Sequence, residues 1–443
     1  MNLSNLVEEY CTQLRRRQIK GSFACAKKTA EVMRLLITTQ RHPDAASLIE
    51  DVRTVGTKLQ AAKPVELGIG NIVRRVLHMI REEQQQEQLE ASEGSSTPGD
   101  ASKGPQGPGL LSQAFRPGSN LRAFNRAVSL SNLLDTPAMS ADGLSSSFSG
   151  ILTAAADAVA AAAAGDAQAA DAEGMRRQQS SRKGRAPPQW SSKNNVIEML
   201  NELLDELDGI EQQIAQQAVE HIHANEVILT YGMSDTTFLF LKEASRKREF
   251  QVVVAEAAPR FDGHTMARQL ADAKVQTTLI ADSAVFAMMA RANKVLVGAH
   301  AVLANGGVIA PAGVHMVALA AKRHSIPFVV LVGLHKLSPL FPHDPDVTLN
   351  DFQSPGQVVD FDVLAESFMR GDEQQQGPDA AAAECLSVEV HNPAYDYIPP
   401  HLISLFVTDT GGYTPAYVYR LLAEYYSRED YSLDKELIDR MKL

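Results

Sequence analysis

The second half of the chain alternates short apolar runs with segments of helical spacing, and this pattern constrains the fold most strongly. The apolar runs, rich in β-branched and aromatic residues, lie at 227–232 (VILTYG), 250–258, 275–283, 294–300, 327–333 and 402–411. Helical segments such as SDTTFLFLKEASRKR separate them, so strand and helix alternate roughly every 20–25 residues. This alternation predicts an α/β fold with a Rossmann-like, doubly wound parallel sheet. The runs are continuously apolar, which is typical of strands buried on both faces.

The first half of the chain predicts helices instead. In 1–83 and again in 191–224, apolar residues recur at intervals of three and four, for example at Leu200 and Leu204. Acidic residues fill the other side of the second segment. We therefore expect an N-terminal helical domain built from these two segments, followed by the α/β domain over 225–443.

Two segments lack the apolar residues that a core needs. Residues 84–190 contain a polar stretch rich in Pro, Gly and Ser, then an alanine tract, then a basic polar stretch. Such a segment has too little large apolar surface to offset the entropy of ordering, which predicts a disordered low-complexity insertion. The alanine tract is either a transient helix or a docking segment. A shorter stretch, 366–384, is expected to be a surface insertion in the α/β domain.

Charge and cysteine content limit the class of protein. The chain has 42 Lys and Arg against 53 Asp and Glu, a formal net charge of −11, which argues against a nucleic-acid-binding protein. The three cysteines form no CxxC pair, which favours a reducing compartment. The N-terminus lacks the apolar core of a signal peptide, and the longest apolar stretch, 308–321, is broken by Pro311 and Gly313. We expect no membrane span and a location in the cytosol of the cytoplasm.

The common nucleotide and metal motifs are missing. The turn after the first apolar run reads TYGMSDT, with one glycine where a dinucleotide-binding GxGxxG would be needed, and the chain contains no GxxxxGK[ST]. It also contains no HExxH. His221 and His223 are two residues apart, so they point to different sides of a helix. We therefore predict no cofactor and no metal.

Several charged residues follow the predicted strands, at the edge where an α/β sheet carries its chemistry. Asp262, Asp282 and Asp409 lie at or just after strand ends. For Asp282 a helix-capping role and a functional role are both open, since aspartate accepts N–H bonds at helix starts. Arg260 and Arg268 flank a predicted helix start, where they either hold an anion or are solvated.

The stretch 227–331, which contains VGAHAVLANGGVIAPAG at 297–313, resembles a known family. It is similar to the superfamily that joins methylthioribose-1-phosphate isomerases to the regulatory subunits of eukaryotic translation initiation factor two-B. The resemblance covers 1–83, 191–365 and 385–430. Within the family, NPAYDYIPPHLISLFVTDTG and the tyrosine-rich YVYRLLAEYY resemble the beta group of these subunits.

The resemblance implies an isomerase site that has lost its reactive groups. The isomerases of this superfamily use a cysteine in a T-x-C-N turn after the first strand and an aspartate in a G-A-D…N-G-D run. In this chain Gly232 stands at the first position and Gly307 at the second. Glycine cannot move a proton, so the resemblance implies a non-catalytic chain that keeps the loops of the site.

The resemblance also implies a biological role. It indicates a regulatory subunit of the five-subunit guanine-nucleotide exchange factor that reloads initiation factor two with GTP. The implied partners are the delta, alpha, gamma and epsilon subunits of that complex and the alpha subunit of initiation factor two, whose phosphorylation the complex senses to control translation. The alternative is a sugar-phosphate isomerase or phosphosugar-binding protein of the same superfamily, which the loss of both reactive positions disfavours.

Two surfaces are candidates for contacts with these partners. The acidic helix face near Asn195, Glu198 and Glu202 would meet basic residues of the alpha subunit of initiation factor two, and a solvated helix face accounts for it equally well. The face that pairs with another subunit is expected to include Asn225, Gln251, Tyr417 and Tyr419. Tyrosines are frequent at interfaces, and they are also frequent at the edge of a core.

Overall fold

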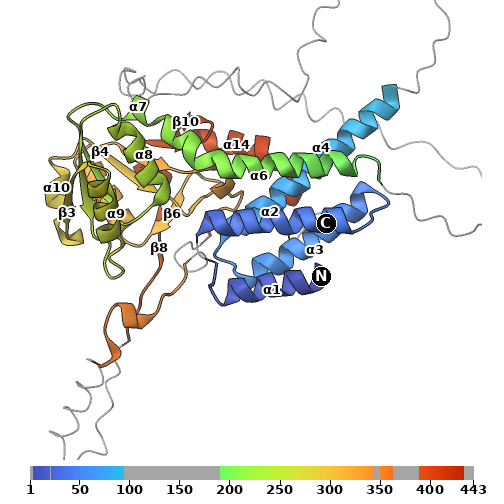
Figure 1. The fold of residues 1–443 in the computed structure, drawn as a ribbon, viewed down its shortest axis with the longest axis horizontal. Helices are drawn as coiled ribbons and strands as arrows, with labels where there is room; N and C mark the ends of the chain where they lie inside the picture. Colours follow the sequence, from blue (N-terminus) through green and yellow to red (C-terminus); the bar gives the residue numbers. More distant parts are fainter. Residues whose placement is uncertain (1–2, 20, 94–189, 344–349, 363–388, 434–443) are drawn as a thin grey trace, which may run out of the picture. The chain divides into compact units, whose positions relative to one another are not determined.

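The computed structural model describes most of the chain. The described residues are 3–19, 21–93, 190–343, 350–362 and 389–433. The predicted surface insertion at 366–384 and residues 94–189 of the predicted low-complexity insertion lie outside them. The predicted fold class is confirmed: helices precede a mostly parallel sheet that is interleaved with further helices (Figure 1).

The N-terminal part of the described chain is helical. Its helices are α1 (Leu3–Arg15), α2 (Ser22–Thr39), α3 (Ala45–Ala62), α4 (Leu67–Glu93), α6 (Lys193–Gln216) and the short α7 (Ala218–His221). Helix α3 begins where the side chain of Asp44 accepts a hydrogen bond from the backbone N–H of Ser47 (3.1 Å), a typical N-cap. Helix α6 buries a stripe of side chains spaced three or four apart, from Val196 to Ile214, and packs beside α2 (Figure 1).

The boundary predicted at residue 83 is wrong. Helix α4 continues to Glu93 through a stretch of Gln and Glu, which are good helix formers but carry no apolar period. At the other end of the predicted insertion, Trp190 is buried, and its Nε1 donates to Glu87 Oε2 (2.6 Å). Its backbone N–H donates to the carbonyl oxygen of His42 (2.9 Å). Both ends of that segment are therefore part of the helical region.

The main sheet has the strand order β10-β9-β7-β4-β1-β2-β3. Its strands are β1 (Val227–Tyr231), β2 (Gln251–Ala255), β3 (Gln276–Ile280), β4 (Lys294–Gly298), β7 (Phe328–Leu331), β9 (Leu405–Thr408) and β10 (Gly411–Tyr413). The strands up to β9 pair in parallel, and β10 runs antiparallel at the edge. The six predicted strands thus appear in the order of a doubly wound Rossmann sheet. In such a sheet the strands before and after the point between β1 and β4 are added in opposite directions, although all of them run parallel.

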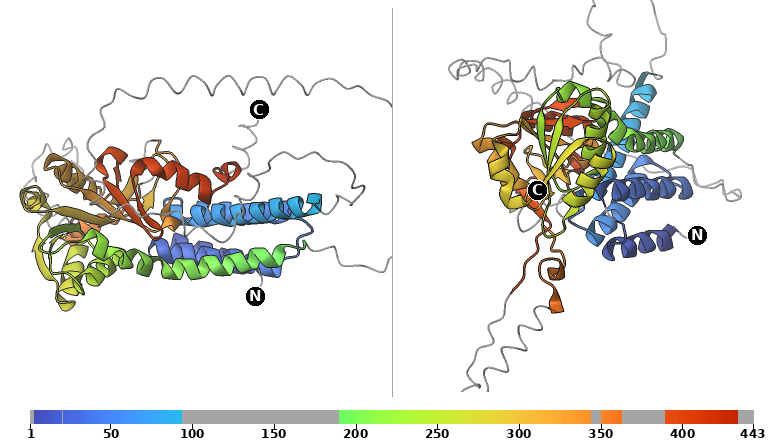
Figure 2. Two further views of the ribbon diagram at one scale, coloured as in Figure 1. Left: turned by 90° about the horizontal axis from the view of Figure 1, so that it is seen from above. Right: turned by 60° about the vertical axis from the view of Figure 1, so that its left-hand side comes forward.

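Helices cover both faces of the main sheet (Figure 2). They are α8 (Asp235–Ser245), α9 (Asp262–Asp272), α10 (Val285–Met289), α11 (Val314–Arg323) and α14 (Val418–Tyr425). Leu229 and Val295 of the sheet share one apolar cluster with Val285 of α10 and Val317 of α11. The intervening strand residues face the other way because side chains alternate along a strand, and the right-handed crossovers place α8 and α9 on that side. Short 3₁₀ turns are η1 (Asp282–Ala284), η2 (Leu334–Lys336), η3 (Pro355–Gln357), η5 (Pro400–Leu402), η6 (Pro415–Tyr417) and η7 (Arg428–Asp430).

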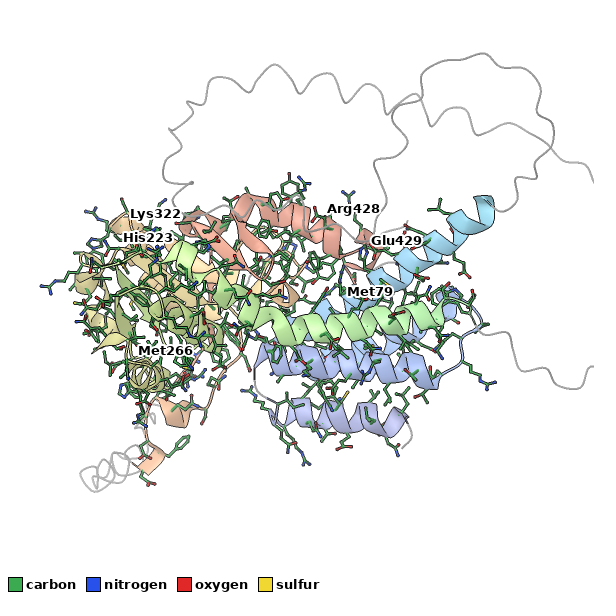
Figure 3. All side chains as sticks on the ribbon, turned by 45° about the horizontal axis from the view of Figure 1, so that its top comes forward. Met79, His223, Met266, Lys322, Arg428 and Glu429 are labelled. Carbon is green, nitrogen blue, oxygen red and sulfur yellow. The ribbon has the colours of Figure 1, made fainter. Side chains whose placement is uncertain are left out.

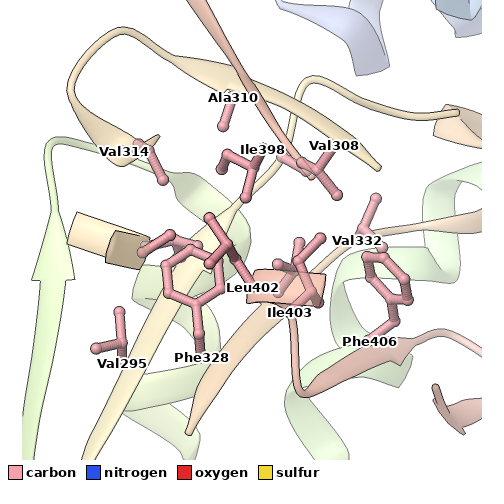
Figure 4. Close-up of a cluster of buried hydrophobic side chains, with 14 of the residues drawn as sticks. Val295, Val308, Ala310, Val314, Phe328, Val332, Ile398, Leu402, Ile403 and Phe406 are labelled. Carbon is pink, nitrogen blue, oxygen red and sulfur yellow. The ribbon is translucent and has the colours of Figure 1, made fainter. Parts of the chain in front are cut away.

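A second, antiparallel sheet lies beyond the end of β4 and was not predicted from the sequence. Its strands are β5 (Ala301–Val302), β6 (Val308–Pro311) and β8 (Tyr395–Ile398), in the order β5-β6-β8. In Figure 4, Val308 and Ile398 of this small sheet point toward the same core as Val295 and Phe328 of the main sheet. The glycine-rich stretch after β4 is therefore a hairpin and not a simple loop.

The segment after α14 packs against the helical region through buried charge. Asp430 is fully buried; its Oδ1 accepts from Arg53 Nη2 (2.6 Å) and its Oδ2 from Arg81 Nε (2.7 Å). Arg74 Nε donates to the backbone carbonyl of Tyr431 (3.1 Å), and burial lowers the pKa of this guanidinium to about 10. Figure 3 shows Glu429 of this segment beside α4. We call this set, Arg53, Arg74, Arg81 and Asp430, the C-terminal joint.

Candidate functional site

The carboxyl ends of β1 and β4 meet where the strand order reverses, which is where doubly wound sheets bind ligands. Gly298 ends β4, and a Cβ built on it would lie 2.4 Å from Ser234 Oγ. Ser234 is the N-cap of α8, since its Oγ accepts from the backbone N–H of Thr237 (3.3 Å). The first turn of α8 therefore packs directly on the end of β4 and leaves no space there for a side chain.

Gly232 follows β1 at this edge. Its φ of +62° lies in the left-handed region, which glycine adopts at little cost. Its backbone N–H donates to the carbonyl of Ala255 (3.2 Å), and a Cβ built on it would lie 3.2 Å from Ala257 Cβ. A cysteine at this position would adopt a strained backbone conformation and crowd the loop after β2.

Gly307 lies in the hairpin between β5 and β6, where Tyr397 occupies the space beside it. A Cβ built on Gly307 would lie 2.5 Å from both Oη and Cε2 of Tyr397. Asn305 joins the two residues, because its Nδ2 donates to Tyr397 Oη (2.7 Å) and its Oδ1 accepts from the Gly307 N–H (2.9 Å). Gly232 and Gly307 thus face different neighbours, and the structure does not show them sharing one pocket.

Asp282 binds a loop and does not cap the helix that follows it. Its Oδ1 accepts from the backbone N–H of Ala257 (2.9 Å) and its Oδ2 from that of Ala258 (2.7 Å). Tyr231 Oη lies 3.5 Å from Asp282 Oδ2, and burial raises the pKa of this phenol well above its usual value. The carboxylate of Asp282 therefore fixes the turn after β2, a long-range role that the capping hypothesis did not include.

Asp396 was not singled out in the sequence, although it sits at the same edge. From β8, its Oδ2 accepts from the backbone N–H groups of Gly313 (2.7 Å) and His315 (3.2 Å). These are the free donors at the start of α11, so the carboxylate occupies the place that an anionic ligand would take. The sequence does contain a sign of this role: Asp396 stands between Tyr395 and Tyr397 in an apolar, aromatic stretch. A carboxylate that becomes partly buried there needs a hydrogen-bond partner.

Asp409, the third aspartate predicted at a strand end, also accepts a hydrogen bond from the backbone. Its Oδ1 accepts from the N–H of Leu334 (2.9 Å), and burial raises its pKa. Asp262 is the first residue of α9 and forms an ion pair with Arg260. The charge of Arg260, which was a candidate for holding an anion, is therefore paired within the chain. The acids predicted at this edge are therefore engaged in holding loops.

A buried cluster joins the start of α4 to the same edge. Glu66 is 2% exposed and pairs with Lys63 (Nζ–Oε2 3.2 Å). The ring of His300 stacks on Tyr395 with centroids 4.4 Å apart, and burial lowers the pKa of this imidazole. Lys336 Nζ donates to the carbonyl of Ala299 (2.9 Å), and burial lowers the pKa of this amine. This cluster is polar, internally hydrogen-bonded and adjacent to the switch point of the sheet.

The described residues give no sign of a metal centre or of a membrane-spanning segment. No group of three or more His, Cys, Asp or Glu side chains in this part of the chain is placed to hold an ion. Of the two histidines near the start of β1, His221 is buried and His223 is exposed, so they do not converge. None of the helices described here combines the length and apolar character that crossing a bilayer would need.

The residues predicted to bind a partner lie together on α6. Asn195, Glu198 and Glu202 are all exposed, and the two glutamates are one helical turn apart. Asn195 Nδ2 donates to Glu83 Oε1 of α4 (2.5 Å), so it also links two helices. The two glutamates present an acidic surface to solvent.

The residues predicted to form one pairing face are separated. Asn225 and Gln251 lie at the amino ends of β1 and β2, where the Asn225 N–H donates to the carbonyl of Glu249 (2.8 Å). Tyr417 and Tyr419 follow β10 at the far edge, with Tyr419 72% exposed. Since β2 and β10 are five positions apart in the sheet, the two pairs lie about 20 Å or more from each other. A pairing face that includes all four would have to extend across the sheet, and it stays a prediction.

Comparison with known proteins identifies the family. The pattern of the "Initiation factor 2 subunit family" matches residues 18–415. The chain belongs to this family. Over 96% of its length it is 38% identical to "Translation initiation factor eIF2B subunit beta" of Dictyostelium discoideum, covering 95% of that protein. It is 35% identical to the protein of the same name from Schizosaccharomyces pombe, covering 96% of both chains.

Solved structures and one more distant relative extend this result. The crystal structure of eIF2B beta from Chaetomium thermophilum superposes with a TM-score of 0.61 at 24% identity, covering 97% of this chain and 94% of that one. A chain from the "tetrameric eIF2B-beta2-delta2 complex" of the same fungus gives 0.58 at 23% identity and 96% coverage of both. These likenesses show the shared fold. The "Ribose 1,5-bisphosphate isomerase" of Archaeoglobus fulgidus is 28% identical over 52% of this chain and 68% of its own length.

Proposed function

We propose that this chain is a non-catalytic regulatory subunit, in the beta position, of the exchange factor that reloads initiation factor two with GTP. The observation that carries the proposal is the identity of 38% and 35% to two eIF2B beta subunits over nearly the whole chain. Similarity of this length covers the helical region and the sheet together, and so supports the same role for both parts of this chain.

The geometry of the two glycine positions supports a non-catalytic role. Proton transfer between the carbons of a sugar phosphate needs titratable groups within reach of the substrate. Gly232 has a left-handed backbone, and the space beside Gly307 is filled by Tyr397, so neither position accommodates a reactive side chain without rearrangement. We regard these positions as a degenerate isomerase site.

An isomerase remains the second candidate, because a ribose bisphosphate isomerase is 28% identical over half of the chain. The purified full-length chain should leave ribose 1,5-bisphosphate and methylthioribose 1-phosphate unconverted, as followed by phosphorus NMR. The non-catalytic proposal would be rejected if the chain converts either substrate and if a Tyr397→Ala variant changes the rate of that conversion.

The proposed partners are the delta, alpha, gamma and epsilon subunits of the exchange factor and the alpha subunit of initiation factor two. For the last of these, the exposed acidic face of α6 at Glu198 and Glu202 is the proposed contact, because a basic partner would be attracted to it. Through this contact the complex would sense phosphorylation of initiation factor two. The proposed site of action is the cytosol.

The first test is affinity purification of the tagged full-length chain from cytosol, followed by mass spectrometry. We expect four partner subunits in near-stoichiometric amounts, and initiation factor two in smaller amounts. Recovery of the chain alone, or only as a homodimer, would reject the proposal.

A second test addresses the acidic face. The double variant Glu198→Lys, Glu202→Lys should slow association of the assembled complex with initiation factor two about tenfold at low salt, with a smaller effect at high salt. The control is Glu8→Lys, Glu9→Lys, a pair of exposed glutamates on α1. An equal effect of both double variants would indicate general charge and not a specific face.

A further inference from the structure

The outer side of helix α6 carries acidic side chains that have no counter-charge. Four exposed carboxylates follow one another over successive turns and so share one side of the helix; we call them the α6 acidic face: Glu198, Glu202, Asp205 and Glu206. Two cations of α2 reach the helix but bind other residues. Lys27 Nζ pairs with Asp208 Oδ1 (2.6 Å). Arg34 Nη1 donates to Asn201 Oδ1 (3.0 Å). Within the described part of the chain, no cation forms an ion pair with the α6 acidic face.

Helix α6 has no cation of its own to offer to this face. Its single basic residue, Lys193, is buried, and its Nζ donates to the backbone carbonyls of Thr38 (3.3 Å) and Gln40 (2.7 Å). Like charges four residues apart repel each other along a helix, and a lysine or arginine at the same spacing would offset this repulsion. The counter-charge of the face therefore has to come from outside the helix.

A basic segment of the chain stands shortly before this helix in the sequence. Residues 176–185, RRQQSSRKGR, contain four arginines, one lysine and no acid, although the whole chain has a formal net charge of −11. They lie outside the described residues. Their charge is opposite to that of the α6 acidic face, and opposite charges favour both the encounter and the correct pairing of two surfaces. The chain thus carries the counter-charge that the face lacks.

The segment is also close enough in the sequence to reach the face. Trp190 is buried and hydrogen-bonded to α4, just before the start of α6. Arg185 precedes Trp190 by five residues, which span up to about 17 Å, whereas Glu198 follows it by eight residues, about 12 Å at the rise of a helix. Arg176 precedes it by fourteen residues, up to about 48 Å, and Glu206 follows it by about 24 Å. A segment that runs back along α6 therefore spans the whole face.

We propose that residues 176–185 bind the α6 acidic face and compete there with the alpha subunit of initiation factor two. The binding follows from charge and reach, and it does not depend on the identity of any partner. The competition rests on the proposed function, which assigns this face to initiation factor two. While the segment is bound, it neutralises the carboxylates that would attract a basic partner, so initiation factor two associates more slowly with the complex.

The short connection makes this contact effective although each ion pair is weak. An ion pair between exposed side chains contributes little, and salt screens it. The connection to Trp190, however, holds the segment near α6 at an effective concentration on the order of millimolar. The segment therefore occupies the face within one chain, and a partner that presents more basic residues still displaces it.

Zero-length crosslinking of the full-length chain tests the binding without initiation factor two. A carbodiimide joins a lysine amine to a carboxylate that touches it, and mass spectrometry identifies the joined residues. We expect Lys183 to crosslink to the α6 acidic face at low salt. The yield should fall at least about threefold at about 0.5 M salt, where the Debye length is only a few ångströms.

Two controls belong to this measurement. Lys103 is the other lysine between residues 94 and 189, and it is far from α6 in the sequence, so its crosslinks to the face should stay at background. An equal mixture of unlabelled and nitrogen-15-labelled chain shows whether a crosslink forms within one chain or between two.

Association kinetics of the assembled complex test the competition. Replacing the five cations of the segment with glutamine should speed association with initiation factor two about threefold at low salt and leave it unchanged at high salt. The substitutions are Arg176→Gln, Arg177→Gln, Arg182→Gln, Lys183→Gln and Arg185→Gln. The matched control changes the net charge by nearly the same amount and should stay within about 1.5-fold of wild type. It replaces the four cations of 94–189 that precede the alanine tract: Lys103→Gln, Arg116→Gln, Arg122→Gln and Arg126→Gln.

The outcomes separate this inference from the function on which its second part rests. If Lys183 crosslinks to the face no more than Lys103 does, the proposal is overturned and the proposed function stands. If the crosslinks join labelled to unlabelled chains, the occupant is the segment of a second copy, and the proposal is overturned as well. If Lys183 crosslinks within one chain but both glutamine variants associate like wild type, the competition is wrong, and so is the proposed contact of initiation factor two with α6. If the crosslinks form and the complex does not bind initiation factor two, the binding of the segment stands and the proposed function fails.

Discussion

Two regions of the molecule differ in which side chains they bury. The C-terminal joint buries charged side chains, whereas the exposed side chains Phe286, Met316 and Leu319 of α10 and α11, here called the α10–α11 face, leave apolar surface in contact with solvent. At the joint, Asp430 is fully buried between Arg53 and Arg81. At the face, Met316 and Leu319 are about half exposed. Soluble proteins usually bury the apolar groups and expose the charged ones. The difference suggests that the joint is completed within this chain, whereas the face is left incomplete until a partner covers it.

The two regions should therefore respond to substitution in different assays. A buried ion pair stabilises a fold only while every partner is present, and removal of one partner leaves an uncompensated charge. An exposed apolar side chain contributes little to folding, and it contributes to binding once it is covered. Damage to the joint should appear in the stability of the isolated chain, and damage to the face should appear in assembly.

The largest effect is expected at the joint. Asp430→Asn removes the buried anion shared by Arg53 and Arg81 and leaves Arg81 only the exposed Glu429; it should lower the free energy of unfolding by about 3–5 kcal/mol, measured by urea denaturation. The control is Glu429→Gln. This carboxylate also pairs with Arg81 (2.7 Å), but it is 72% exposed and should cost less than about 1 kcal/mol. Equal costs would mean that burial does not distinguish the joint from an ordinary surface pair.

The next effect concerns a buried titratable group without a partner. His221 is 2% exposed, neither ring nitrogen has a hydrogen-bond partner among the described residues, and burial lowers its pKa to about 4 from 6.5. Because the folded-state pKa is depressed, the unfolded chain binds more protons between these values. Stability is therefore complete above pH 6.5 and is lost as the pH falls toward 4, by about 3 kcal/mol.

Urea denaturation at about pH 7 and about pH 4.5 would measure this loss. His221→Phe should flatten the pH dependence, because the substituted ring does not titrate. His223→Phe, at an exposed position two residues away, should leave it unchanged. If both variants keep the full pH dependence of stability, a group other than His221 causes it. The comparison of paired with unpaired buried groups would then have only Asp430 as its support.

The main sheet was predictable because most of its strands are continuous apolar runs between turn residues. The edge strand β3 (Gln276–Ile280) is an exception: it is largely polar, and its residues are exposed or half-buried, so the expected burial on both faces is wrong for this strand. The run at 227–232 became β1, and the stretch 402–411 became β9 and the start of β10. The small sheet was not predictable, since β5 has two residues and β6 pairs with β8, a strand about ninety residues later in the chain. The end of α4 was missed because a helix that is polar on all sides has no apolar period to read.

The candidate site was predictable only in part. The positions of Gly232 and Gly307 followed from the resemblance, but their surroundings depend on Ala257 and Tyr397, which come from other strands and loops. The role of Asp282 depends on a loop 24 residues earlier in the chain, and such long-range hydrogen bonds leave no local pattern. The exposed apolar side chains of α11 could have been predicted from the sequence, because Met316 and Leu319 do not belong to the buried stripe of their helix, which includes Val317 and Ala321.

A smaller effect on stability is expected at Gly307, one of the two positions of the proposed degenerate site. Gly307→Ala places a Cβ 2.5 Å from Tyr397 and should lower the free energy of unfolding by about 1–3 kcal/mol, as overpacking does. Combining it with Tyr397→Ala should cost less than the sum of the two single variants, which a double-mutant cycle would measure. Gly209→Ala is the control: this glycine lies within α6, where alanine should stabilise by up to about 1 kcal/mol. Additive costs at 307 and 397 would mean that Tyr397 does not occupy the space beside Gly307.

The smallest effect on stability is expected at the α10–α11 face, where the effect on assembly is expected to be large. Leu319→Glu should change the unfolding free energy of the isolated chain by no more than about 0.5 kcal/mol, because the side chain is already 52% exposed. The same purified variant should then lose binding to the delta subunit, so that one substitution separates folding from assembly. Urea denaturation of the isolated chain provides the first measurement and a binding isotherm the second. A loss of several kcal/mol in the isolated chain would instead make Leu319 part of the fold, and the contrast with the C-terminal joint would disappear.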